Sequence, residues 1–188
     1  ANDPAPTKVV VDTNDDPGVA GDGQISFQEY FVRHRHSIPV RELRLGASSA
    51  QPTHEAIEAL TTADAVVIAP SNPFVSIGPI RALPHVDQIL AKRRTTVVAI
   101  SPLVGGDAVK GPAADMMVRF GFQSNSAGIA EIYRNVCSHL IIDSKDTSLA
   151  SEVELAGMTA TVTNTIMGDA QVDANLARLT LAAADVAL

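Results

Sequence analysis

Two loops in the sequence carry residue types that bind phosphate groups. The first spans residues 70–80 and contains Ser71, Asn72, Ser76 and Gly78. A helix is expected to begin near Gly78, and its free N–H groups would then face an anion. The alternative, a rigid turn between a strand and a helix with capping side chains, stays open on the sequence alone.

The second loop spans residues 101–112 and contains Gly105, Gly106 and Lys110. Paired glycines allow the backbone to approach a phosphate, and a lysine before a helix N-terminus adds a positive charge. The loop is not a Walker A motif, because Pro112 stands where that motif requires lysine. One such loop is a weak signal, whereas two at the same edge of one sheet are a stronger one.

An apparent calcium-binding loop near the N-terminus fails on its spacing. Asp12-Thr13-Asn14 and residues 22–29 look like the two halves of an EF-hand loop. Seven residues separate Asn14 from Asp22 where the motif allows one. The dense turn residues of this stretch favour a hairpin turn over a cation site.

Two further features favour structural roles. The run Arg33-His34-Arg35-His36 could meet a phosphate, but such a run is more often a solvated strand or a partner surface. The single cysteine, Cys137, cannot form a disulfide within the chain, and we expect it to be packed and inert. No catalytic residue follows from the order of Ser, His and Asp, since sequence distance carries no geometry.

The composition excludes several classes of protein. The 188 residues are 46% hydrophobic and carry a net charge of -7, with 14 Lys and Arg against 21 Asp and Glu. Such an acidic chain without a basic stretch is not expected to bind nucleic acid. No apolar run approaches the ~18 residues of a membrane-spanning helix, and no secretory signal is recognised. We therefore expect a cytoplasmic protein that does not bind membranes.

The hydrophobic pattern predicts the elements that position the two loops. From Thr53 onward, short apolar runs alternate with helical patterns, which predicts a parallel sheet with helices on both faces. The expected strands are 65–69, 96–100, 139–142 and 159–163, and the expected helices follow residue 53 and cover 86–92, 113–120, 127–136, 147–155 and 173–188. Ligands bind outside the carboxyl ends of the strands in such sheets, where both loops begin.

The first 46 residues have a different pattern. Strands are expected at 8–11, 25–32 and 40–45, joined by turns rich in Asp, Asn and Gly. We expect a single α/β domain in which residues 1–46 form a small antiparallel β unit. Residues 47–188 would form the nucleotide-binding part.

Several stretches, taken in order, make up a pattern that covers nearly the whole chain. They are Asn2-Asp3-Pro4 with Thr7, residues 27–33, residues 70–73 with 76–80, residues 100–102 with Gly105-Gly106 and 108–112, and Thr165-Ile166-Met167. This pattern resembles the 2-phospho-L-lactate transferase family, which acts in coenzyme F420 biosynthesis.

The resemblance implies a Rossmann-like fold and a transferase activity. A phospholactyl-type group would move from a guanylylated donor, of the lactyl-2-diphospho-5'-guanosine type, to the deazaflavin Fo, with release of GMP. The resemblance also implies Mg²⁺ as a cofactor, with the guanine nucleotide (GDP) and Fo as binding partners. Carried over residue by residue, it assigns nucleotide contacts to Ser71, Asn72, Ser76, Gly78, Gly105, Gly106 and Lys110.

The N-terminal part of the family has no counterpart in this sequence. Family members begin with a strand and a glycine-rich loop, followed by an acidic segment that binds metal and Fo. The chain is therefore expected to be the C-terminal portion of a longer enzyme, with no metal ligand and no assigned catalytic residue of its own. Which phospho-acid the donor carries (phospholactate, phosphoenolpyruvate or 3-phosphoglycerate) stays open.

Two other functions stay open beside the transferase. The chain could be a non-catalytic module that binds a nucleotide or nucleotide-sugar, as in the gluconeogenesis-factor proteins of similar fold. Alternatively, the antiparallel unit could supply the surface of a homodimer. Residues 27–33 and the loop 101–112 favour the transferase.

Overall fold

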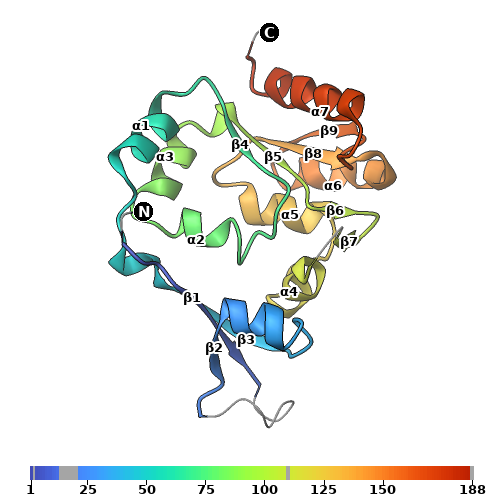
Figure 1. Cartoon of the computed structure of the whole chain (residues 1–188). Coiled ribbons are helices and arrows are strands. Elements are labelled where there is room, and N and C mark those ends of the chain that lie inside the picture. The colour runs from blue at the N-terminus through green and yellow to red at the C-terminus, as the bar shows by residue number, and fades with distance from the viewer. Residues whose placement is uncertain (2, 13–20, 109–110, 187–188) are drawn as a thin grey trace.

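Two sheets organise the chain. Figure 1 shows the computed structural model, which describes residues 1, 3–12, 21–108 and 111–186. An antiparallel sheet of three strands lies at one end, and a parallel sheet of four strands forms the larger part. This architecture confirms the expected α/β fold with a preceding antiparallel unit. The division expected near residue 46 stays a prediction, although the last strand of that unit ends at Leu45.

The antiparallel sheet consists of β1 (Thr7–Val11), β2 (Gln24–Ser26) and β3 (Val40–Leu45) in the order β2-β1-β3. The β-branched side chains of β1 are suited to a pleated sheet. Val9, at the centre of this unit, pairs with Ile25 on one side and Leu43 on the other, and its side chain is fully buried.

The strand expected at residues 25–32 is wrong beyond Ser26. A helical segment begins at Phe27 and continues as η1, a short π-type helix (Glu29–Arg33). The Ser26 hydroxyl accepts a hydrogen bond from the Glu29 N–H at 3.0 Å, which caps the first turn. Ser26 and Glu29 have the Ser-x-x-Glu spacing of a capping box, a helix-start signal that outweighs the strand-like alternation of the following aromatics.

The parallel sheet confirms the four expected strands. It consists of β4 (Val66–Ile68), β5 (Val97–Ile100), β8 (His139–Asp143) and β9 (Thr159–Thr163) in the order β4-β5-β8-β9. All three pairings are parallel. The carboxyl ends of the strands therefore meet at one edge of the sheet.

Short helices connect these strands and cover the sheet. The α-helices are α1 (His54–Thr62), α2 (Gly78–Arg81), α3 (Val86–Lys92), α4 (Ala113–Arg119), α5 (Ser126–Tyr133), α6 (Ala150–Leu155) and α7 (Ala170–Ala183). The remaining elements are the 3₁₀ turns η2 (Gly46–Ser49), η3 (Arg94–Thr96) and η4 (Ser144–Leu149) and the short strands β6 (Leu103–Val104) and β7 (Asp107–Ala108). The expected helices form with shifted ends, and the one expected at 147–155 begins as η4.

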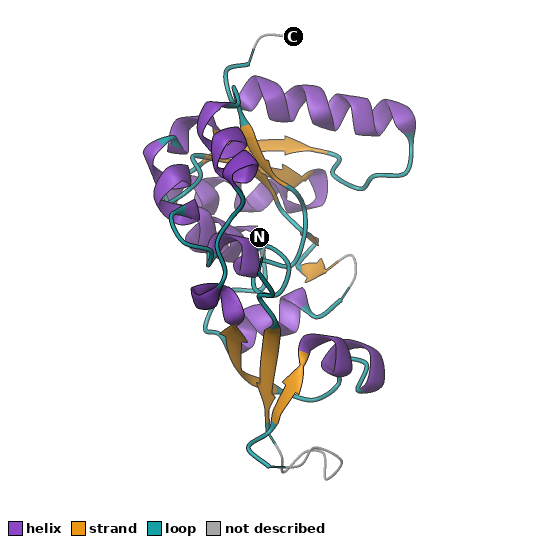
Figure 2. Ribbon diagram, turned by 60° about the vertical axis from the view of Figure 1, so that its left-hand side comes forward, coloured by secondary structure: helices purple, strands orange, loops and turns teal. Residues whose placement is uncertain are grey.

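The two faces of the sheet are covered unequally. Side chains of α3, α5 and α6 pack on one face, while α7 packs on the other against Val98 and Ile141 (Figure 2). The apolar run at 65–69 was expected to be covered on both faces, and this is wrong for β4. Because β4 is an edge strand to one side of α7, Val67 remains 43% exposed.

The antiparallel unit shares a hydrophobic core with the larger part. Val9, Val11 and Tyr30 cluster with Val75, which follows β4, and with Met116 of α4. This contact brings the helical segment 27–33 next to the carboxyl edge of the parallel sheet. No helix in the described part of the chain is long and apolar enough to cross a membrane.

Candidate functional site

A cavity of about 470 Å³ opens at the carboxyl edge of the parallel sheet. The loops after β4, β5 and β9, the start of α4 and the helical segment 27–33 form its wall. The lining residues are Phe27, Phe31, Pro70, Ser71, Asn72, Val75, Ser76, Ser101, Pro102, Val104, Gly111, Pro112, Ala113, Thr165, Ile166 and Met167. Open parallel sheets bind their ligands at this edge.

Asn72 shapes the loop after β4. Its Oδ1 accepts hydrogen bonds from the N–H groups of Phe74 (2.9 Å) and Val75 (3.2 Å), and its carbonyl accepts one from Ser76 at 3.1 Å. The Oδ1 atom of Asn72 is thus used within the turn, whereas its Nδ2 donates to Met116 Sδ at 3.5 Å. The hydroxyls of Ser71 and Ser76 form no hydrogen bond with any other described residue. They can therefore bind a ligand in the cavity.

The predicted Gly78 lies outside this cavity. It lines a second groove between β3, α2 and α4, together with Arg41 and Phe120. A Cβ atom at Gly78 would lie 3.1 Å from the Pro73 carbonyl oxygen, so the close approach of the loop backbone explains the glycine. The sequence analysis placed Gly78 and Ser76 in one site because they are two residues apart. In the structure Ser76 lines the cavity and Gly78 lines the second groove.

The paired glycines of the second loop form a β-turn. Gly105 and Gly106 have φ angles of +66° and +84° and join β6 to β7 as a two-residue hairpin. They do not line the cavity, whereas Val104 before them and Gly111 after them do. The predicted Lys110 lies outside the described residues. Nucleotide contacts by these three residues therefore stay predictions.

Ser101 anchors the start of the same loop. Its side chain is buried, and its Oγ accepts a hydrogen bond from the Leu103 N–H at 3.2 Å and contacts Ser126 Oγ at 3.2 Å. Ser101 follows the strand β5 directly and lines the cavity. Its hydroxyl therefore fixes the loop that leaves the sheet.

Thr165 brings the loop after β9 into the wall. Its N–H and its hydroxyl donate hydrogen bonds of 2.9 and 3.0 Å to Asp143 Oδ2 at the end of β8. Burial acts to raise the pKa of Asp143, but the hydrogen bonds from Thr165, Lys145 and Ser144 favour the charged form and lower the pKa overall. Because its proton points at Asp143, the Thr165 hydroxyl has only lone pairs left for a ligand.

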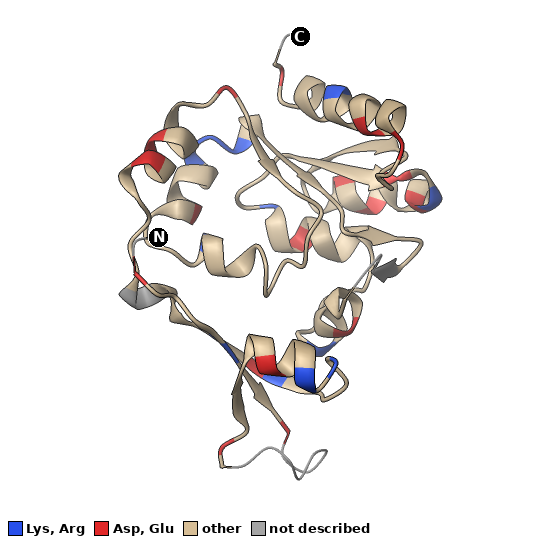
Figure 3. Cartoon of the chain, viewed as in Figure 1, with Lys and Arg blue, Asp and Glu red and all other residues tan. Residues whose placement is uncertain are grey.

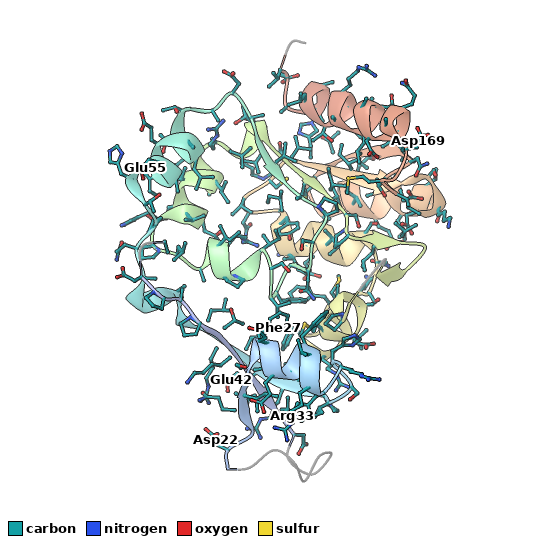
Figure 4. All side chains as sticks on the ribbon, viewed as in Figure 1. Asp22, Phe27, Arg33, Glu42, Glu55 and Asp169 are labelled. Carbon is teal, nitrogen blue, oxygen red and sulfur yellow. The ribbon has the colours of Figure 1, made fainter. Side chains whose placement is uncertain are left out.

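Two aromatic side chains complete the wall and were missed as site residues. Phe27 and Phe31 lie one helical turn apart, with ring centroids 5.8 Å from each other. Figure 4 shows Phe27 on the side of the antiparallel unit that faces the larger part, away from Asp22 at the tip. The capping-box spacing Ser26-x-x-Glu29 was the available signal, since it predicts the helix that places both rings on one face.

The wall combines apolar side chains with hydroxyl groups. Three of its large apolar side chains, Phe31, Ile166 and Met167, are 42%, 45% and 57% exposed. None of the described lining residues is ionisable. Figure 3 shows charges of both signs on η1 and acidic residues on α6. The described wall can therefore hold a ring and polar groups, but it supplies no acid or base.

Comparisons with known proteins identify the family of the chain. The model of the family described as 2-phospho-L-lactate transferase CofD matches residues 2–180. The chain belongs to the CofD family. A 2-phospho-L-lactate transferase of Methanococcoides burtonii is 37% identical over 158 residues, which are 83% of this chain and 51% of that protein. A phosphoenolpyruvate transferase of Streptomyces avermitilis is 36% identical, over 86% of this chain and 51% of that protein.

A solved structure supports the fold of this CofD family member. A protein of the UPF0052 family from Bacillus halodurans superposes with a TM-score of 0.65 at 12% identity, covering 96% of this chain and 60% of that one. This likeness concerns the fold alone. The chain spans about half the length of the curated relatives that it matches.

Magnesium, which the resemblance to the CofD family implies, does not fit the described wall. Mg²⁺ prefers carboxylate and other oxygen ligands, and the described lining residues include no carboxylate. Within the described ranges no group of three or more His, Cys, Asp or Glu could hold a metal ion. The nearby Asp143 directs both carboxylate oxygens at N–H and O–H donors.

Two minor features do not line the cavity, although the His36 ring lies 5.5 Å from that of the lining residue Phe31. Arg33 forms an exposed ion pair with Glu29, N–O distance 3.1 Å, and Arg35 and His36 have φ angles of +48° in a turn rather than a strand. Cys137 is fully buried and donates to the Val97 carbonyl, and burial raises the pKa of its thiol to about 11. This confirms that Cys137 is packed, and its raised pKa disfavours the reactive thiolate.

Proposed function

We propose that this chain supplies the nucleotide-binding part of a transferase of coenzyme F420 biosynthesis. The enzyme would move a phospholactyl-type group from a guanylylated donor to a hydroxyl of Fo. A new bond forms between that oxygen and the donor phosphorus, and the bond from this phosphorus to the bridging oxygen breaks. GMP leaves with the electron pair of the broken bond, and the hydroxyl proton passes through solvent to the GMP phosphate. The observation that carries the proposal is the cavity at the carboxyl edge of the sheet, in a chain of the CofD family.

The chain's own residues would bind and orient the donor. The hydroxyls of Ser71 and Ser76 are suited to phosphate oxygens, since a hydroxyl donates one hydrogen bond. The apolar side chains Phe27, Phe31 and Met167 are suited to a planar ring. Holding the donor phosphorus in line with an incoming hydroxyl accelerates transfer by orientation rather than by proton transfer.

A second function is favoured by the lack of ionisable side chains in the described wall. A module that binds a nucleotide or nucleotide-sugar without turnover needs only such a wall. Uniform binding of a substrate does not accelerate its chemistry. The two functions differ in whether binding is followed by transfer, so both can be tested with the same variants.

Replacement of the two cavity hydroxyls tests the proposal. A hydrogen bond to a charged acceptor such as phosphate contributes about 1.5–3 kcal/mol, so Ser71→Ala and Ser76→Ala should each weaken GDP binding by about ten- to a hundredfold. Calorimetry with GDP measures the affinity, and a transfer assay with Fo and the guanylylated donor measures turnover. Ser151→Ala, on the exposed face of α6, is the matched control.

Three results are informative. Weakened GDP binding in the two cavity variants alone supports the site. Transfer by the relevant full-length enzyme that falls with GDP affinity supports the transferase, whereas binding without transfer supports the binding module. GDP affinity that is the same in Ser71→Ala, Ser76→Ala and Ser151→Ala would contradict the site itself.

A further inference from the structure

The strand β8 lies inside the sheet, yet no described residue of β8 or η4 lines the cavity. Its neighbours β5 and β9 both send their following loops into the wall. The carboxyl end of β8 instead carries Asp143, and Asp146 follows in η4. Both side chains are buried, with 2% and 4% of their surface exposed. Buried carboxylates are costly unless they are fully hydrogen-bonded, so their partners show what they do.

Asp143 binds the loop on one side of β8. Its Oδ2 accepts hydrogen bonds from the N–H and the hydroxyl of Thr165, while Oδ1 accepts one from the Lys145 N–H at 3.0 Å. Thr165 is the first of three consecutive lining residues after β9, followed by Ile166 and Met167. The carboxylate therefore sets where this part of the wall begins.

Asp146 binds the loop on the other side. Both of its carboxylate oxygens accept from the Gly105 N–H, at 3.1 and 3.0 Å. Gly105 is the first residue of the hairpin turn, directly after the lining residue Val104. Hydrogen bonds to a charged acceptor are stronger than neutral ones, which suits them to holding a tight turn at a fixed distance from the sheet.

We propose that Asp143 and Asp146 are positioning residues that fix the two walls of the cavity on either side of β8. They act through Thr165 and Gly105 and do not themselves contact the ligand. The identity of the ligand as a guanine nucleotide rests on the proposed function, whereas the positioning of the two loops does not. The interior strand β8 and the turn that follows it thus hold the neighbouring loops in place without lining the cavity themselves.

Hydrogen exchange and GDP binding, measured on the same variants, test this role. Asp143→Asn leaves one oxygen acceptor where two are used, and Asp146→Ala removes the acceptor of Gly105. We expect amide exchange to rise at least about tenfold at 165–167 in the first variant and at Gly105 in the second, with GDP binding weakened at least about fivefold in both. Thr53→Ala is the control, because it removes the Thr53 hydroxyl, which accepts a hydrogen bond from the Ala56 N–H at 3.2 Å at the start of α1, outside the cavity.

The outcomes separate the positioning role from general stability. The Asp143 and Asp146 variants are compared with Thr53→Ala at equal loss of thermal stability. If their local amide exchange and GDP affinity change no more than in Thr53→Ala, the proposal is overturned. If the wild-type chain does not bind GDP, the proposed function fails and the exchange measurement alone decides the positioning role. If Asp143→Asn does not fold, Thr165→Val and Thr165→Ser replace it: only the valine variant, which lacks the hydroxyl, should raise exchange at 165–167. Equal exchange in that pair would also overturn the proposal.

Discussion

At the residue scale, Lys110 would supply the positive charge that the described wall lacks. It directly precedes the lining residue Gly111, although Lys110 itself lies outside the described residues. A hydrogen bond from a charged donor is worth about 1.5–3 kcal/mol, so Lys110→Ala should weaken GDP binding about ten- to a hundredfold with little change in Tm. Calorimetry measures the loss, with Lys92→Ala at the exposed end of α3 as the control. An unchanged Kd would remove Lys110 from the site.

Asp143 should make the protein less stable in acid. Its folded pKa is lowered, below an unfolded value of about 3.9, because Thr165 and Lys145 hydrogen-bond the charged form although burial opposes it. The resulting stabilisation is complete above about pH 5 and is lost as the pH falls through the folded pKa.

Urea unfolding at several pH values measures this effect. The free energy of unfolding of Asp143→Asn should lie below that of the wild type at neutral pH, and the difference should shrink below about pH 4. Asp64→Asn, an exposed residue between α1 and β4, serves as the control. A difference that stays constant from neutral pH to pH 2 would show that Asp143 stabilises the fold through shape rather than charge.

At the scale of elements, the helical segment 27–33 should depend on its capping side chain. Ser26→Ala removes the acceptor of the Glu29 N–H and should lower the free energy of unfolding by about 0.5–2 kcal/mol. Because the segment carries Phe27 and Phe31 into the wall, GDP binding should weaken as well. Denaturant unfolding and calorimetry check both effects against Ser37→Ala, whose hydroxyl serves only a turn carbonyl. If Ser26→Ala binds GDP as tightly as the wild type, the rings of Phe27 and Phe31 do not contribute to GDP binding.

The sequence predicted elements better than it predicted the wall of the cavity. Buried runs such as 97–100 predict strands because few other elements of that length are wholly apolar. The pair Gly105-Gly106 was ambiguous, since the same positive φ angles serve a phosphate-binding loop and a hairpin turn. Phe27 could not be placed in the wall from the sequence, because it arrives there through packing of the antiparallel unit against residues about 45 to 90 positions away, namely Val75 and Met116.

At the scale of the whole molecule, the antiparallel unit and the parallel sheet together enclose one cavity. The antiparallel unit covers the carboxyl edge of the parallel sheet and supplies the aromatic side of the cavity, while the strand loops supply the hydroxyls. A nucleotide bound there should touch both parts. The second groove, lined by Arg41, Arg81 and Phe120, lies between the same two parts but carries neither free serine.

Amide hydrogen exchange with and without GDP tests the central claim most directly. Binding in the cavity should slow exchange at 27–31, 71–76 and 165–167 together, because these segments line it. Exchange at 41–45 and 78–81, which border the second groove, should not change. Protection confined to the second groove, or no protection at saturating GDP, would contradict a nucleotide site at the carboxyl edge of the parallel sheet.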